Sequence, residues 1–144
     1  MHVDNHTQRD RVQPDCNSNE RYKHVLNDES TAVFNGKVLV TRGSQRIDAY
    51  QQNDTIVLTD DANIYTKPEL ESYADDVVCS HGATTGQVDE EGVFYLRSRG
   101  LSERRAHILM LQAFTDEVVS EYKITQLRDY IAEKIRQRFA SYFA

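Results

Sequence analysis

The sequence is poor in cysteine and has no tryptophan: Cys16 and Cys79 are the only two thiols among 144 residues. Two cysteines so far apart cannot build a disulfide framework, and no Cys-x-x-Cys pair indicates a closed zinc site. No apolar run reaches the length that crosses a bilayer, and the first ten residues lack the apolar core of a signal peptide. We therefore expect a reducing, cytoplasmic setting and no membrane partner.

Basic charge is also scarce. The 17 lysine and arginine residues face 23 acidic residues, which gives a net charge of -6 at pH 7. Broad nucleic-acid binding needs a basic surface that neutralises phosphates, so we expect no nucleic-acid partner. Nucleotide-binding and hydrolase motifs are missing too, since Gly36-Lys37 is followed by valine and neither Gly-x-Ser-x-Gly nor Gly-x-Gly-x-x-Gly occurs. We expect a chain that is not an enzyme, with any ATP chemistry supplied by a partner.

Short β-rich runs fill the chain as far as Gly86. They cover residues 22–26, 31–34, 37–41, 55–59, 63–66 and 76–84, with turn residues between them. Asn35-Gly36 separates two apolar runs and, taken alone, favours a two-residue hairpin between antiparallel strands. The other corners recur at uneven intervals of solenoid-like size, which is compatible with coiling β-rungs and equally with a sandwich.

After Gly86 the pattern becomes helical. Asp89 can cap a first helix that carries Val93, Phe94 and Leu96, and Gly100 can end it. Ser102 is expected to cap a second helix and Thr125 a third. The apolar face expected for the second helix consists of Ala106, Leu109, Met110, Ala113, Phe114 and Val118, with Ile108 and Leu111 off that face.

The most informative stretch is Cys79-Ser80-His81, which lies in the last β-rich run. Side chains two apart on a strand share one face, so the thiol and the imidazole point the same way while Ser80 points to the other side. Thiolate and imidazole are ligands of soft iron and sulfur species, although two ligands make only a partial site. The alternative is that Cys79 is a buried small hydrophobe and His81 a hydrogen-bonded corner residue.

Seven segments resemble, in order, the C-terminal part of the SufD-type members of the SufB/SufD family. They are residues 18–23, 33–37, 48–51, 66–70, 73–76, 79–84 and 94–100. The resemblance implies a mainly β protein with α, in which residues 1–87 are the C-terminal rungs of a right-handed parallel β-helix and residues 88–144 form a small helical domain. It replaces the hairpin at Asn35-Gly36 with β-helix structure.

The resemblance also implies that this chain is a C-terminal fragment of a longer protein. Its first rung would then be open, and unpaired strand edges invite pairing with another copy. We therefore expect homo-association through the N-terminal rung.

The function implied by the resemblance is that of a non-catalytic subunit in an iron–sulfur cluster assembly scaffold of the SufBCD type. His81 would act in cluster assembly at the interface with a SufB-type paralogous subunit, with Cys79 close by. The fragment alone would bind no cofactor, and an iron–sulfur cluster would be present only transiently in the complex. The C-terminal helices would receive the SufC-type ATPase, and the candidate contact residues there are Arg104, Arg105, Ile108, Leu111 and Glu117.

Two other functions stay open on the residues alone. One is an autonomous metal-binding or metal-delivery module that uses Cys79 and His81, with His2 and His6 near the start as further candidates. The polar residues around the latter pair favour an exposed strand instead. The other is a β-helix enzyme acting on polysaccharide, which would require several acidic groups on one face of successive rungs.

Overall fold

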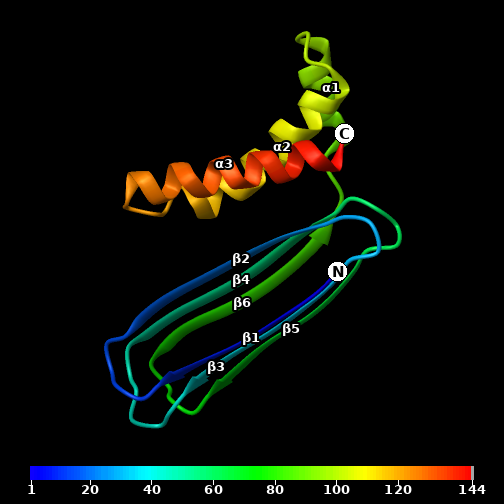
Figure 1. Ribbon diagram of the computed structural model, residues 1–144. Helices are drawn as coiled ribbons and strands as arrows, with labels where there is room; N and C mark the ends of the chain where they lie inside the picture. Colours follow the sequence, from blue (N-terminus) through cyan, green and yellow to red (C-terminus); the bar gives the residue numbers. More distant parts are fainter. Residues whose placement is uncertain (144) are drawn as a thin grey trace.

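The computed structural model describes residues 1–143, which form six strands followed by three helices (Figure 1). The strands are β1 (His2–Arg11), β2 (Asn17–Leu26), β3 (Thr31–Val40), β4 (Ile47–Val57), β5 (Asn63–Ser72) and β6 (Val77–Gly86). The helices are α1 (Glu90–Ser98), α2 (Glu103–Val119) and α3 (Thr125–Tyr142). None of the helices in this described part is long and apolar enough to span a membrane. The protein is therefore mainly β with a helical C-terminal part, as predicted.

The six strands form two parallel sheets of three strands each, in the orders β1-β3-β5 and β2-β4-β6. Consecutive strands lie in different sheets, so each further pair of strands adds one strand to both. The register is continuous across a sheet: Asn17 pairs with Asp48, and Asp48 with Val78. This arrangement leaves β5 and β6 as neighbouring edge strands at one end of the two sheets (Figure 1).

The core lies between the sheets, and every second residue of β3 and β4 points into it. Phe34, Val40 and Ile47 are fully buried there. The strands are ten or eleven residues long and include polar residues that interrupt the predicted runs, such as Gln51 and Asn53. The predicted strands were too short because backbone pairing with a neighbouring strand keeps polar residues in extended conformation, and β3 and β4 are paired on both sides.

The hairpin that Asn35-Gly36 suggests on its own is wrong. Both residues lie inside β3, where Gly36 pairs with Thr7 of β1 and Pro68 of β5. Gly36 points into the core, and a Cβ atom there would lie 2.5 Å from Nε2 of Gln51 in the opposite sheet. The glycine therefore permits a close approach between the two sheets, rather than the positive φ of a tight turn.

The helix caps agree with the sequence at two of three N-termini. Asp89 accepts a hydrogen bond from the Glu91 amide, and Ser102 accepts one from the Arg105 amide. Gly100 follows α1 with a φ of 96°, as a glycine placed after a helix often does. The third cap is wrong: α3 begins after Ile124, which provides no side-chain hydrogen bond, and Thr125 is already helical.

The buried face of α2 differs from the predicted one. Leu111 is 0% exposed, whereas Leu109 and Ala113 of the expected apolar face are exposed. The reason is that α2 contacts α1, α3 and β2 at once, so its buried surface is wider than a single stripe. Phe94 of α1 is 72% exposed, whereas Val93 next to it is buried.

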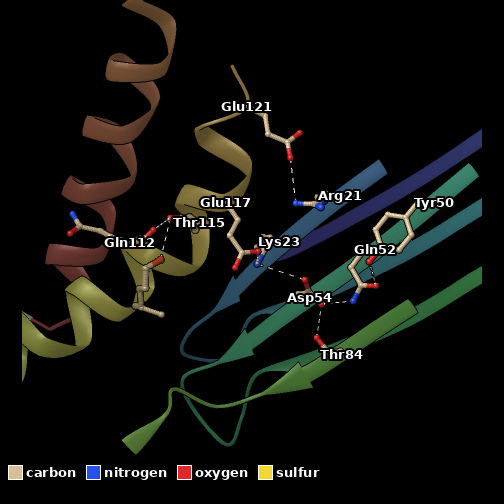
Figure 2. A network of polar contacts seen from close by, with 11 residues as sticks. Arg21, Lys23, Tyr50, Gln52, Asp54, Thr84, Gln112, Thr115, Glu117 and Glu121 are labelled. Atoms are coloured by element: carbon tan, nitrogen blue, oxygen red, sulfur yellow. Dashed lines mark hydrogen bonds and ion pairs between the residues drawn. The ribbon is translucent and has the colours of Figure 1, made fainter. Parts of the chain in front are cut away.

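The helices join the strands through the outer face of β2, on the side away from the other sheet (Figure 1). Lys23 of β2 donates to Glu117 of α2 at 2.6 Å, and its ammonium lies 4.2 Å from the centre of the Phe114 ring. Arg21 Nη1 lies 3.4 Å from Oε1 of Glu121, in the turn that follows α2. Figure 2 shows that both basic side chains point from β2 toward the carboxylates of Glu117 and Glu121.

Candidate functional site

Cys79 and His81 lie on β6, the edge strand of the sheet β2-β4-β6. Cys79 pairs with Ala49 and His81 pairs with Gln51, both of which point into the core. Paired residues of neighbouring parallel strands point to the same side of a sheet, so the thiol and the imidazole share the inner face. Ser80 belongs to the outer face.

Cys79 is half-buried and packs against an apolar cluster between the two sheets. That cluster contains Val38, Val40, Ile47 and Ala49, and Cys16 packs against it as well. Burial raises the pKa of the Cys79 thiol above its ordinary value. A raised pKa lowers the thiolate fraction at neutral pH. These surroundings therefore make Cys79 a weaker nucleophile and a weaker ligand than a solvent-exposed cysteine.

His81 lies next to Cys79 in the same inward row but is exposed, because no further strand covers the edge of β6 in the described part of the chain. An exposed imidazole on an inner face can contact both the strand behind it and a molecule that approaches the edge. His81 is therefore the more accessible of the two candidate ligands.

Two buried polar residues stand behind His81 in the same register. Glu20 of β2 pairs with Gln51 of β4, and Gln51 pairs with His81 of β6. Gln51 Nε2 donates to Glu20 Oε2 at 2.8 Å, and Arg9 of β1 donates to Glu20 Oε1 at 2.6 Å. Glu20 and Gln51 are 6% and 0% exposed, so His81 ends a row of polar side chains that starts deep between the sheets.

This row of polar side chains was not predicted from the sequence. Glu20, Gln51 and His81 recur at nearly equal spacing, as paired residues of successive strands in one sheet do. That spacing was the available signal. The signal was not recognised because the turns between the predicted runs are unevenly spaced, so they did not show which strands are paired.

The histidines near the start are not brought to this site. His2 and His6 lie on β1, an edge strand of the other sheet, while β5 is the strand of that sheet next to β6. Both are exposed, and His6 lies 2.8 Å from Asp4. Among residues 1–143, no three His, Cys, Asp or Glu side chains are grouped in a way that could hold a metal ion.

The residues predicted to contact an ATPase lie on α2 in different surroundings. Arg104 and Arg105 are exposed, and Arg104 also donates to the carbonyl of Ala140 at 3.0 Å. Ile108 is half-buried and Glu117 is bound by Lys23. Leu111, which was expected off the apolar face, is buried inside the helical part, because α2 packs on three elements.

The comparison with family models matches residues 1–114 to the SufBD core domain of SUF system FeS cluster assembly. The chain belongs to this family. The match covers all six strands, α1 and most of α2, and it confirms the resemblance seen in the sequence.

Similar proteins carry the same family name. The iron–sulfur cluster assembly protein SufD of Escherichia coli (strain K12) is 39% identical over 123 residues, which are 85% of this chain and 29% of that protein. A SufBD family protein of Synechocystis is 40% identical over 121 residues, 84% of this chain and 27% of that protein. A SufBD family protein of Mycobacterium leprae is 32% identical, covering 94% of this chain and 36% of that protein. The chain thus spans about a third or less of these relatives.

Proposed function

We propose that the chain is a non-catalytic part of an iron–sulfur cluster assembly scaffold of the SufBCD type, in which His81 faces the cluster at an interface with a SufB-type subunit. The observation that carries this proposal is the position of His81, exposed on the unpaired edge of β6 in a chain of the SufBD family. The cluster is the cargo of this scaffold. A cytoplasmic location belongs to the same proposal and agrees with the low cysteine content.

The fold proposed for the strands is the C-terminal end of a right-handed parallel β-helix. Odd strands form one parallel sheet and even strands the other, which is the order that a coiling chain produces. The edges of β5 and β6 would then be the open end of the coil, where a paralogous subunit can add strands by backbone hydrogen bonds. The edges of β1 and β2 are open in the same way, which supports self-association of this chain at high concentration.

A SufC-type ATPase is proposed to bind the helices rather than the strands. The helical part exposes large apolar side chains, which a partner can cover. They include Phe94, Tyr95, Leu109, Tyr122, Ile124, Leu127 and Tyr130. Arg104 and Arg105 add exposed positive charge at the start of α2, whereas Glu117 would have to leave Lys23 before it could bind a partner.

The decisive experiment replaces His81 with alanine in the full-length protein and measures cluster assembly on the complex. We expect a strong loss of assembly with unchanged retention of the SufB-type and SufC-type subunits. Ser80→Ala is the matched control, because Ser80 adjoins His81 on the outer face and should leave assembly intact. Normal cluster assembly by His81→Ala would refute the proposed role.

Subunit binding is tested separately with this chain. We expect it to retain a SufC-type ATPase through residues 90–142 and to lose that binding when the helices are removed. Iron titration of the chain alone tests the autonomous metal-binding alternative, and tight binding without any partner would favour that alternative.

A further inference from the structure

Gln51 is a fully buried amide that lies between Glu20 and His81 in one sheet. Space for its side chain comes from the opposite sheet, where Gly36 has no side chain and a Cβ atom would lie 2.5 Å from Nε2 of Gln51. The interior is therefore shaped around this glutamine. Such a buried polar side chain requires partners for both of its amide atoms.

The orientation of the Gln51 amide is fixed by chemistry. A carboxylate only accepts hydrogen bonds, so the amide atom 2.8 Å from Glu20 Oε2 must be the NH₂ group. Arg9 Nε donates to the other oxygen of Glu20 at 2.6 Å and holds this side chain in place. The Gln51 carbonyl oxygen, Oε1, is left buried without a hydrogen-bond partner among the described residues.

Two nearby groups could donate to this oxygen. The imidazole of His81 is the neighbour of Gln51 on β6, in direct register and on the same inner face. The amide of Asn53 lies two residues further along β4 on that face, and its Nδ2 is also buried without a partner among the described residues. The hydrogen bond between Asn53 Oδ1 and Nδ1 of His24 does not engage Asn53 Nδ2. His81 is favoured by distance, because neighbouring strands lie about 4.8 Å apart, whereas residues two apart on one strand lie roughly 6.6 Å apart.

We propose that Gln51 is a positioning residue for His81: its Oε1 accepts the ring N–H of His81, with Glu20 and Arg9 holding the amide from behind. A hydrogen bond to one ring nitrogen selects one tautomer of a neutral imidazole. The other nitrogen then has a free lone pair that faces the open edge of β6. The role of that lone pair toward iron or sulfur rests on the function proposed for His81, whereas the hydrogen bond does not.

The test is ¹⁵N NMR of the His81 ring at a pH where the ring is neutral, with signals assigned by their loss in His81→Gln. The variants are Gln51→Leu, which removes the acceptor, and Glu20→Gln, which keeps the shape but no longer dictates the direction of the Gln51 amide. Gln52→Leu is the matched control, because Gln52 is the adjacent glutamine on the outer face of β4. Glu20→Gln decides the matter if Gln51→Leu fails to fold.

We expect one tautomer to dominate in the wild type and in Gln52→Leu. In Gln51→Leu and Glu20→Gln the ratio of the two tautomers should fall by about fivefold, which is the effect of one hydrogen bond of ordinary net strength. An unchanged ratio in Glu20→Gln would overturn the proposal, as would equal tautomer populations in the wild type.

A second arm separates this proposal from the function of His81. Cluster assembly by the full-length protein should slow in Glu20→Gln and keep its rate in Gln52→Leu. If the tautomer ratio changes while His81→Ala still assembles clusters normally, the positioning stands and the proposed role of His81 in assembly fails. If the ratio is constant and His81→Ala still abolishes assembly, the positioning fails and the role of His81 stands.

Discussion

The strand part and the helical part of this chain are stabilised in different ways. Each strand from β1 to β6 is hydrogen-bonded along its whole length to a strand that lies two elements away in the sequence. The helices pack on one another and contact the strands through α2 and β2, where Lys23 binds Glu117 of α2 and Arg21 binds Glu121 just after α2. The strands therefore form one cooperative unit, while the helices are attached to it through a small surface.

The two proposed functions, the role of His81 and the docking of an ATPase, depend on these two parts of the chain separately. His81 depends on the register of three strands, because its neighbours Gln51 and Glu20 come from β4 and β2. The exposed apolar residues of the helices depend only on local helical structure. A partner could thus act on the helices with little effect on the geometry around His81, and four experiments test this separation.

The largest effect is expected from truncating a buried phenylalanine in each part. Phe34→Ala in β3 should lower the free energy of unfolding of the whole strand region by about 3 to 5 kcal/mol, because Phe34 is fully buried. Phe139→Ala in α3 removes a similar side chain, but the loss should be confined to the helices. Hydrogen exchange measures both, and loss of protection in β3 and β4 in Phe139→Ala would contradict the separation.

The next effect concerns the joint between the two parts. Lys23→Met keeps an unbranched side chain over Phe114 but removes the charge that pairs with Glu117 and that lies 3.7 Å from Asp54. We expect the free energy of unfolding of the helical part to fall by about 1 to 3 kcal/mol. This lies between the values typical of exposed and of buried ion pairs.

Arg21→Met is the control for this joint. Its pair with Glu121 is longer and more exposed, so the change in unfolding free energy should stay below about 1 kcal/mol. Urea unfolding followed by circular dichroism measures both variants. An effect of Arg21→Met as large as that of Lys23→Met would show that the joint does not depend on the buried lysine.

A smaller effect on stability is expected from a change of pH that protonates His24, which lies in the interior of the strand region. Burial lowers the pKa of His24 below its ordinary value of 6.5, although a hydrogen bond with Asn53 opposes that shift. The unfolded chain binds this proton more readily than the folded chain does. The contribution of His24 to folding stability is therefore fully present above pH 6.5, and it is lost as the pH falls through the pKa that His24 has in the folded chain. The slope from one such group is at most about 1.4 kcal/mol per pH unit.

His24→Gln should remove this part of the pH dependence. The measurement is the difference in unfolding free energy between the wild type and His24→Gln from pH 8 to pH 5, by urea titration. A difference that does not vary with pH would show that His24 titrates alike in the folded and unfolded chain. The other four histidines, His2, His6, His81 and His107, are present in both proteins, so the difference isolates His24.

The smallest effect on stability is expected at the exposed face of α1. Phe94→Ser should change the unfolding free energy by no more than about 0.5 kcal/mol, because the ring is 72% exposed, while it weakens retention of a SufC-type ATPase. Tyr65→Ser on β5 is the control, since Tyr65 is similarly exposed but lies on the strands. Equal loss of retention in both variants would argue against docking on the helices.

The sequence predicted the change from strands to helices near Gly86 and the shared face of Cys79 and His81, because both follow from local periodicity. It did not predict the length of the strands, since Gln51 and Asn53 are polar residues buried by pairing with distant strands. Asn35-Gly36 illustrates the same limit: the local pattern indicates a turn, but the glycine is needed for the approach of Gln51. The role of the Lys23–Glu117 pair depends on two residues far apart in the sequence.

The parallel register also determines where the chain can change in length. The bends between strands lie outside the paired residues, so an insertion there leaves the row from Glu20 to His81 intact. Deleting a single residue within β6 before His81, with the pairing of the preceding residues kept, would instead turn the imidazole to the outer face. Length variation among related chains should therefore collect at the bends, and the distance along β6 from Val77 to His81 should stay constant.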